Sequence, residues 1–195
     1  AVAYGSVLKA GGIEGKTILI IGAGTIGACV LQLIKLRKPG KLIVSDLSDS
    51  KLNTALELGA DAVINPAKQN FLETISNLTD GAMIDTSIEC VGVQASANQS
   101  IQCLKVGGTS VWVGMSQKEM TINMQDIVCS ARRVLGSFNY THKEFGQVAE
   151  IVTSGKLATD KLISKIVSLE EAVNIFPEIH EHPDDYLKVI IDPQL

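Results

Sequence analysis

Short apolar runs alternate with longer segments of helical periodicity along the first part of the chain. Residues 17–21 read Thr-Ile-Leu-Ile-Ile, a continuous apolar run that is typical of a strand buried on both faces of a parallel sheet. The next apolar residues recur at helical spacing from Ile26 to Leu36, and Pro39 and Gly40 then end the segment. The pattern therefore predicts a buried strand followed directly by an amphipathic helix.

The same alternation repeats up to about residue 140. We expect further strands at residues 42–44, 62–64, 83–88, 109–113 and 134–138. Helices are expected at 49–58 with Asp49 as the N-cap, at 68–78, at 94–104 and in a short segment ending near Cys129. Gly59 stops the first of these helices, and Gly107 and Gly108 form a turn into the fifth strand. Strand–helix units in succession predict right-handed crossovers and a doubly wound, parallel, six-stranded α/β sheet.

The regular alternation of predicted strands and helices changes after residue 140. A helix at 143–153, Gly155, a strand-like stretch at 162–167, a helix from Ser168 and a final strand at 187–191 follow one another. We therefore divide the chain into residues 1–140 and a C-terminal segment, residues 141–195.

Composition and charge narrow the range of functions. The 195 residues are 46% hydrophobic and 19% charged, which is typical of a globular protein. The net charge of −4, without a block of like charges, argues against nucleic acid or an anionic membrane as a partner. Neither a membrane-spanning run nor a secretory signal is visible. The four cysteines are widely spaced in apolar contexts, so we expect four buried, reduced thiols and a cytoplasmic location.

A glycine-rich turn stands between the first strand and the first helix. Gly22, Gly24 and Gly27 form a G-x-G-x-x-G pattern that also contains Thr25 and Ile26. In such a turn the first glycine permits the sharp bend, the second lets the backbone approach a pyrophosphate, and the third allows close helix–strand packing. The helix that begins there presents free N–H groups and a positive dipole end to phosphates. These features predict a Rossmann dinucleotide-binding fold.

An acidic residue stands at the distance that this motif requires. Asp46 ends the second predicted strand, where a carboxylate accepts hydrogen bonds from the adenosine ribose hydroxyls. The same charge repels a 2′-phosphate, so Asp46 favours NAD over NADP. The alternative is that Asp46 only begins a turn. Lys51 is expected to lie over the adenosine side, or else to be a solvated surface lysine.

The chain resembles the zinc-dependent medium-chain dehydrogenases, most closely the sorbitol and polyol dehydrogenase branch. The resemblance rests on the glycine turn and on the order and spacing of six further short motifs: Asp46-Leu47-Ser48, Leu58-Gly59-Ala60-Asp61, Ile88-Glu89-Cys90-Val91-Gly92, Gly107-Gly108, Val113-Gly114-Met115 and Leu187-Lys188-Val189. It implies the NAD-binding portion of an alcohol or polyol dehydrogenase, in which hydride passes between a secondary alcohol and NAD.

The resemblance also implies roles for two strand ends. Val113, Gly114 and Met115, with Ser137, Phe138 and Asn139, would hold the nicotinamide carboxamide through backbone groups, and Ile26 would pack behind the glycine turn. The polyol branch has an Arg-Tyr pair against the substrate where this chain has Asn139 and Tyr140. Tyr140 fits that role, whereas Asn139 departs from it and puts a sorbitol-like substrate in doubt. Plain packing of Phe138 and Tyr140 is the alternative.

Family members bind their catalytic zinc on a domain that precedes the coenzyme-binding fold. We therefore expect zinc in the parent protein, no metal ligand and no catalytic residue in this chain, and an inactive isolated chain. The cluster His180-Glu181-His182 is expected to be an exposed loop, and His142 a surface residue. Residues 141–195 would return to complete the catalytic domain, with Ile175 and Phe176 buried against it. We also expect a homo-oligomer.

Two other functions stay open at this point. A zinc-free quinone or enoyl reductase of the same superfamily commonly uses NADPH, which Asp46 disfavours. A non-catalytic Rossmann sensor would bind a nucleotide but would not need residues 141–195. The short-chain dehydrogenase pattern Tyr-x-x-x-Lys is not met, because Tyr140 and Lys143 are one position too close.

Overall fold

A computed structural model describes residues 1–195 and contains a six-stranded parallel sheet with the strand order β3-β2-β1-β4-β5-β6. The strands are β1 (Thr17–Ile21), β2 (Lys41–Ser45), β3 (Ala62–Ile64), β4 (Ile84–Glu89), β5 (Leu104–Trp112) and β6 (Arg133–Gly136). This is the dinucleotide-binding strand order, with the reversal between β1 and β4. The predicted doubly wound α/β sheet is confirmed.

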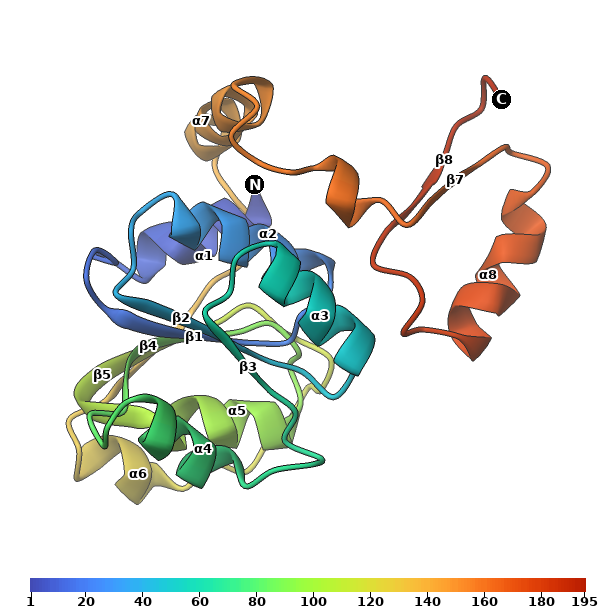
Figure 1. Cartoon of the computed structure of the whole chain (residues 1–195). Helices are drawn as coiled ribbons and strands as arrows, with labels where there is room; N and C mark the ends of the chain where they lie inside the picture. The colour runs from blue at the N-terminus through green and yellow to red at the C-terminus, as the bar shows by residue number, and fades with distance from the viewer.

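Helices cover both faces of this sheet. The helices α1 (Val2–Lys9), α2 (Thr25–Lys35) and α3 (Asp49–Glu57) lie on one face, and α4 (Phe71–Leu78), α5 (Gln94–Gln102) and α6 (Met124–Val128) lie on the other (Figure 1). The larger apolar cluster, of 22 buried residues, lies mainly between the strands and the first three helices. A second cluster of nine buried residues lies on the side of α4. The central strands are apolar on both faces because both faces are covered.

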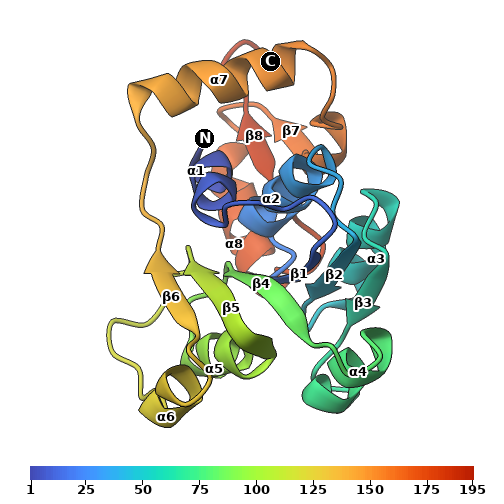
Figure 2. The ribbon, with the colours of Figure 1, turned by 90° about the vertical axis from the view of Figure 1, so that its left-hand side faces the viewer.

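The carboxyl ends of the strands meet along one edge of the sheet (Figure 2). Backbone hydrogen bonds continue past the strand ends: Gly22 N donates to Ser45 O at 2.8 Å, and Cys90 N donates to Ile21 O at 2.8 Å. Ser137 N likewise donates to Trp112 O at 2.7 Å. The loops that follow β1, β2, β4, β5 and β6 are therefore held beside one another, at the edge where open α/β sheets bind ligands.

The C-terminal segment, residues 141–195, adds a second and smaller sheet to the fold. It contains α7 (His142–Thr153), a 3-10 turn η1 (Asp160–Leu162), β7 (Lys165–Val167), α8 (Ala172–Glu181) and β8 (Val189–Ile191). The strands β7 and β8 pair in parallel as a second sheet, beside which α8 lies (Figure 1). Ile175 is buried within this segment, whereas the neighbouring Phe176 is exposed, so the expectation that both are buried against another domain is wrong for Ile175.

Several predicted element ends are wrong for local reasons. Ser48, and not Asp49, caps α3, because its Oγ accepts the Lys51 N–H. Asp49 lies in the first turn, where a carboxylate favours the helix dipole. The helix expected from residue 68 begins at Phe71, where the Asn70 side chain accepts from Glu73 N.

Tertiary pairing changes other boundaries. Gly107 and Gly108 lie inside β5, which begins at Leu104. The pairing register between β4 and β5 shifts between Ile84 and Thr86, and this irregularity accommodates Gly107 at a φ of 74° within the strand. The helix expected from Ser168 begins only at Ala172. His180 and Glu181 belong to that helix, so the exposed loop expected there is wrong, although both residues are exposed.

The cysteines are all free, but they are not all buried. Cys103 is buried, Cys29 and Cys90 are half-buried, and Cys129 is exposed after α6. The prediction of four buried thiols therefore holds fully for Cys103 and in part for Cys29 and Cys90. It is wrong for Cys129, since the apolar residues around it lie on a short helix at the surface. None of the helices is both long and apolar enough to cross a membrane.

Candidate functional site

The glycine turn adopts a geometry that only glycine permits at two of its three positions. Gly22 has a φ of 96°, and a Cβ there would lie 2.7 Å from Cγ2 of Val91. A Cβ on Gly27 would lie 1.8 Å from Gly22 O, so α2 can approach the turn only without a side chain. By contrast, a Cβ on Gly24 would meet nothing within 4 Å. The space above Gly24 is therefore open to a ligand, at the N-terminus of α2.

Asp46 is bound directly to this turn. Its Oδ2 accepts the backbone N–H of Ala23 at 2.6 Å, and its Oδ1 accepts that of Ser48 at 2.9 Å. A carboxylate has roughly four acceptor sites, so each oxygen keeps one for a further donor such as a hydroxyl. The half-buried carboxylate thus fixes the turn and faces the open edge at once.

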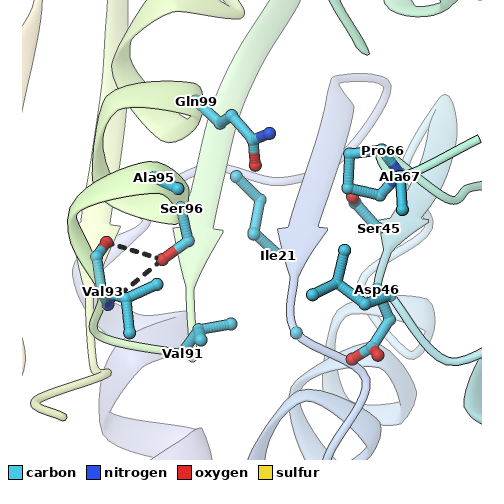
Figure 3. A pocket seen from close by; sticks show the side chains of 12 residues that line it. Ile21, Ser45, Asp46, Pro66, Ala67, Val91, Val93, Ala95, Ser96 and Gln99 are labelled. Carbon is cyan, nitrogen blue, oxygen red and sulfur yellow. Dashed lines mark hydrogen bonds between the residues drawn. The ribbon is translucent and has the colours of Figure 1, made fainter. Parts of the chain in front are cut away.

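A cavity of about 270 Å³ opens beside Asp46 (Figure 3). We call it the base pocket, because a dinucleotide whose ribose is bound by Asp46 would place its base beside this residue. Its twelve lining residues come from the ends of β1 and β2, the loops after β3 and β4, and the first two turns of α5: Ile21, Gly22, Ser45, Asp46, Leu47, Pro66, Ala67, Val91, Val93, Ala95, Ser96 and Gln99. Its walls are mostly aliphatic, with a few polar side chains, which is typical of a small-molecule site.

Glu89 joins the two sides of the edge. This carboxylate is almost completely buried, and its Oε1 accepts the N–H groups of Val91 and Gly92, both at 2.8 Å. Its backbone oxygen accepts Val113 N at 2.8 Å and Gly114 N at 3.1 Å. One residue therefore holds both the loop that lines the base pocket and the end of β5. An acid at the end of an apolar strand is the only feature of the sequence that points to this role.

The close approach of these two loops depends on glycine. A Cβ on Gly92 would lie 2.1 Å from Met115 N, and one on Gly114 would lie 2.1 Å from Gly92 N. Cys90 directly follows β4, and burial, with the charge of Glu89 as a smaller cause, raises the pKa of its thiol. A raised pKa favours the protonated thiol over the nucleophilic thiolate.

The residues expected at the nicotinamide lie at the ends of the neighbouring strands β5 and β6. Val113 and Gly114 are half-buried, and Met115 is exposed. Ser137 is buried, and its Oγ has no hydrogen-bond partner. Phe138 and Asn139 follow β6 and are exposed, Phe138 at 76%. The strand therefore stops at Gly136, and not at Phe138 as expected.

Asn139 and Tyr140, the two residues expected at the substrate, follow β6 directly after Phe138. Asn139 has a positive φ of 56°, and its Oδ1 accepts Tyr140 N at 3.0 Å. The ring of Tyr140 stacks on Phe145 of α7, with centroids 5.8 Å apart. The pair thus lies where the chain passes from β6 into α7.

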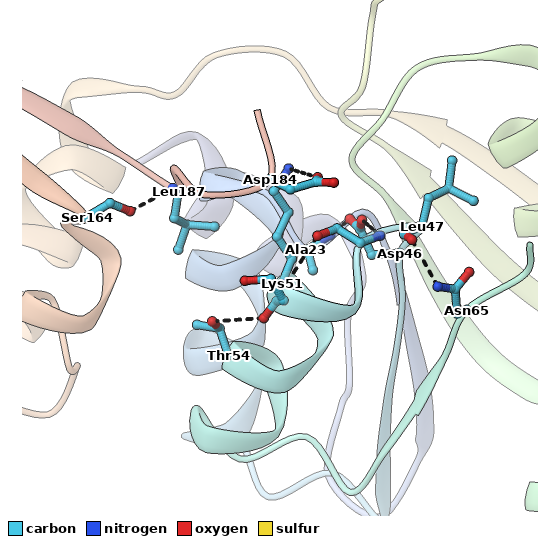
Figure 4. A network of polar contacts seen from close by, with 11 residues as sticks. Ala23, Asp46, Leu47, Lys51, Thr54, Asn65, Ser164, Asp184 and Leu187 are labelled. Atoms are coloured by element: carbon cyan, nitrogen blue, oxygen red, sulfur yellow. Dashed lines mark hydrogen bonds and ion pairs between the residues drawn. The ribbon is translucent and has the colours of Figure 1, made fainter. Parts of the chain in front are cut away.

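The C-terminal segment contacts the first turns of α2 and α3 (Figure 4). The Thr25 hydroxyl donates to Leu187 O, and Lys51 Nζ lies 3.3 Å from Oδ1 of Asp184. Lys51 is therefore ion-paired to the C-terminal segment. Ile26, on the same turn as Thr25, is half-buried and packs against the larger apolar cluster.

Sequence reasoning predicted only Gly22 and Asp46 among the residues that line the pocket. Of the others, Ser45 ends an otherwise apolar strand, a signal that could have been used, whereas Gln99 lies in a helix with no pattern that distinguishes it. No group of three or more His, Cys, Asp or Glu side chains in residues 1–195 is placed to hold a metal ion. The residues here therefore do not fit a zinc centre.

Residues 25–154 match the sequence profile of a family described as zinc-binding dehydrogenase. D-xylulose reductase A of Aspergillus niger is 29% identical over 183 residues, covering 92% of this chain and 51% of that protein. The chain thus spans about half the length of the relatives it matches.

Solved structures agree with this assignment. The 2R,3R-butanediol dehydrogenase of Bacillus subtilis superposes with a TM-score of 0.89 at 27% identity, over 99% of this chain and 55% of that one. A zinc-binding dehydrogenase of Sinorhizobium meliloti, bound to NADP, superposes with a TM-score of 0.87 at 31% identity, over 98% of this chain and 56% of that one. The profile match covers well over half of the chain, and the glycine turn and Asp46 are placed as described. The chain therefore belongs to the zinc-binding dehydrogenase family, of which it represents the coenzyme-binding portion.

Proposed function

We propose that the chain binds NAD across the carboxyl edge of its sheet, as the coenzyme-binding part of an alcohol or polyol dehydrogenase. The observation that carries the proposal is the position of Asp46, which contacts the glycine turn at Ala23 and keeps acceptor sites free beside the base pocket. A ribose whose pyrophosphate lies over Gly24 would bring its hydroxyls to this carboxylate.

Different parts of this sheet edge would then bind different parts of NAD. The N–H groups at the start of α2, around Thr25 and Gly27, bind the pyrophosphate, and Asp46 binds the ribose. The ends of β5 and β6, from Val113 and from Ser137, orient the nicotinamide. When bound, NAD supplies a hydride acceptor. The chain's own residues bind and orient it, and the proposal assigns them no proton transfer.

The choice between NAD and NADP requires a direct test, because the structurally similar Sinorhizobium meliloti protein is bound to NADP. In this chain Asp46 is a carboxylate that would repel a 2′-phosphate, so NAD is the proposed ligand. The D-xylulose reductase and butanediol dehydrogenase names support a substrate that carries a secondary alcohol or the corresponding ketone. We further propose that residues 141–195 form a separate C-terminal unit, and that Asn139 and Tyr140 lie on the substrate side.

Calorimetric titration of the 195-residue chain with NADH and with NADPH tests the proposal. The wild type should bind NADH roughly tenfold or more tightly than NADPH, because charge-assisted hydrogen bonds are the strong ones. Asp46→Asn should lose most of that preference while the fold, followed by circular dichroism, stays intact. Equal binding of both dinucleotides, or a preference that Asp46→Asn leaves unchanged, would overturn the assignment.

A further inference from the structure

Two polar side chains that line the base pocket, Ser45 and Gln99, make no side-chain hydrogen bond within the chain. Ser45 is 1% exposed, and its Oγ is buried without a hydrogen-bond partner. The half-buried Gln99 reaches into the pocket from α5, and the hydrogen bonds drawn there join only Ser96 and Val93 (Figure 3). Nearly all buried polar groups in folded proteins are paired, so an unpaired hydroxyl in a cavity points to a partner that is not part of the chain.

The other polar side chains of the pocket are Asp46 and Ser96, and the Ser96 hydroxyl is already bonded to the Val93 backbone. Ile21 lies between Ser45 and Gln99, and the valines of the β4–α5 loop face Pro66 across the pocket (Figure 3). Such walls suit the two flat faces of an aromatic ring. Ser45 and Gln99 would then meet the edge of that ring, where a base carries its donors and acceptors.

We propose that Gln99 and Ser45 read the base of the dinucleotide and make the site selective for adenine over a 6-oxopurine. The inference rests on the proposed function, because Asp46 must hold the ribose for the base to enter this pocket. A glutamine amide pairs with adenine through its carbonyl and its NH₂ at once, accepting from the 6-amino group and donating to N7. Hypoxanthine has a carbonyl in place of that amino group, so the glutamine oxygen would face another acceptor.

The two side chains have different tasks. The Ser45 hydroxyl both donates and accepts, so it can pair with either purine and adds affinity without selectivity. The Gln99 amide has its donor and acceptor at separate atoms, and it supplies the selectivity. We therefore expect Gln99→Leu to change the ratio of the two dinucleotide affinities, and Ser45→Ala to change both affinities by a similar factor.

The experiment is calorimetric titration with NADH and with reduced nicotinamide hypoxanthine dinucleotide, which differs only at the 6-position and N1 of the base. Wild type should bind NADH about tenfold more tightly, the discrimination typical of one bidentate contact. Gln99→Leu should bring the two affinities to within about twofold. Ser45→Ala should weaken both by a similar factor and leave their ratio unchanged. Gln102→Leu, the same substitution at an exposed position of α5 outside the pocket, should change neither.

Thermal unfolding of the ligand-free chain gives a second readout. Removing an unpaired buried hydroxyl removes a desolvation penalty, so Ser45→Ala should melt roughly 2–4 °C higher although it binds less tightly. A lower melting temperature would show that the hydroxyl is a structural group and would overturn its role.

The outcomes separate the two proposals. If wild type binds both dinucleotides equally, or if Gln99→Leu keeps the full discrimination, the base-reading proposal is wrong while NAD binding stands. If wild type binds neither dinucleotide, the proposed function fails and base reading fails with it.

Discussion

Oδ2 of Asp46 accepts the backbone N–H of Ala23 at 2.6 Å, across 23 positions of sequence. The residue expected to choose the cofactor is therefore also a structural part of the turn expected to bind the pyrophosphate. The hydrogen bond holds the ends of β1 and β2 together in the ligand-free chain. We therefore expect the affinity for the dinucleotide and the geometry of the glycine turn to depend on the same side chain.

That coupling predicts a stability effect without a ligand. Asp46→Ala leaves the partly buried Ala23 and Ser48 amides unpaired, so it should lower the free energy of unfolding by about 1–3 kcal/mol. Asp46→Asn keeps one carbonyl oxygen and should cost less. Urea unfolding of the ligand-free variants measures both, and equal stability of Asp46→Ala and wild type would contradict the coupling.

The glycines of the turn should separate binding from folding. Gly24→Ala places a methyl group in open space, so it should change stability by less than about 1 kcal/mol but weaken NADH at least about tenfold. Gly27→Ala forces a Cβ against Gly22 O and should cost about 1–3 kcal/mol or more. Thermal unfolding and NADH titration of the two variants form a matched pair. Undiminished NADH binding by Gly24→Ala would remove the pyrophosphate from this position.

One thiol should react far faster than the other three. Cys129 is exposed, whereas burial raises the pKa of Cys29, Cys90 and Cys103 and keeps their thiols protonated. A disulfide reagent such as Ellman's should label about one thiol per native chain quickly and the rest only on unfolding. Cys129→Ser should abolish the fast phase. Several fast thiols in the native chain would show that the sheet edge opens more readily than the structure implies.

Stability should fall in acid through Asp85. Burial acts to raise the pKa of Asp85, but hydrogen bonds from Lys105 and from Thr17 N at 2.9 Å, with the charges of Lys105 and Lys16, outweigh it and hold the pKa below its usual range. A depressed carboxyl pKa stabilises the fold above the unfolded value of about 3.9, and the contribution is lost as the pH falls through the folded pKa.

Urea unfolding between pH 6 and pH 2.5 measures that loss. Asp85→Asn should be less stable than wild type at neutral pH and should lose less stability below about pH 4. Asp80→Asn is the control, since Asp80 is exposed and should leave the acid slope unchanged. Parallel curves for Asp85→Asn and wild type would exclude Asp85 as the source.

Much of the fold could be predicted from local pattern. The apolar run at Thr17–Ile21 and the helix that ends before Pro39 are determined by residues close together in sequence, and both appear as expected. Where the expectation was wrong, a distant contact decided the outcome. Gly107, a turn residue by local rules, lies inside β5 because β4 pairs beside it. Cys129 is exposed because the short helix before it lies at the surface of the sheet.

The candidate site divides in the same way. The glycine turn and Asp46 could be predicted from the sequence, because strand, turn and acid follow one another at a spacing set by one strand–helix–strand unit. Glu89 and Gln99 could not, since their roles arise only where loops from non-consecutive strands converge. Ser45 had a signal as the polar end of an apolar strand, but only the fold shows that it lines the pocket. The sequence by itself determined the strand and helix periods, the glycine turn and the negative charge beside it. The tertiary structure alone decided which side chains share the base pocket and which buried groups lack partners, because burial and hydrogen bonding depend on neighbours that the chain brings together only by folding.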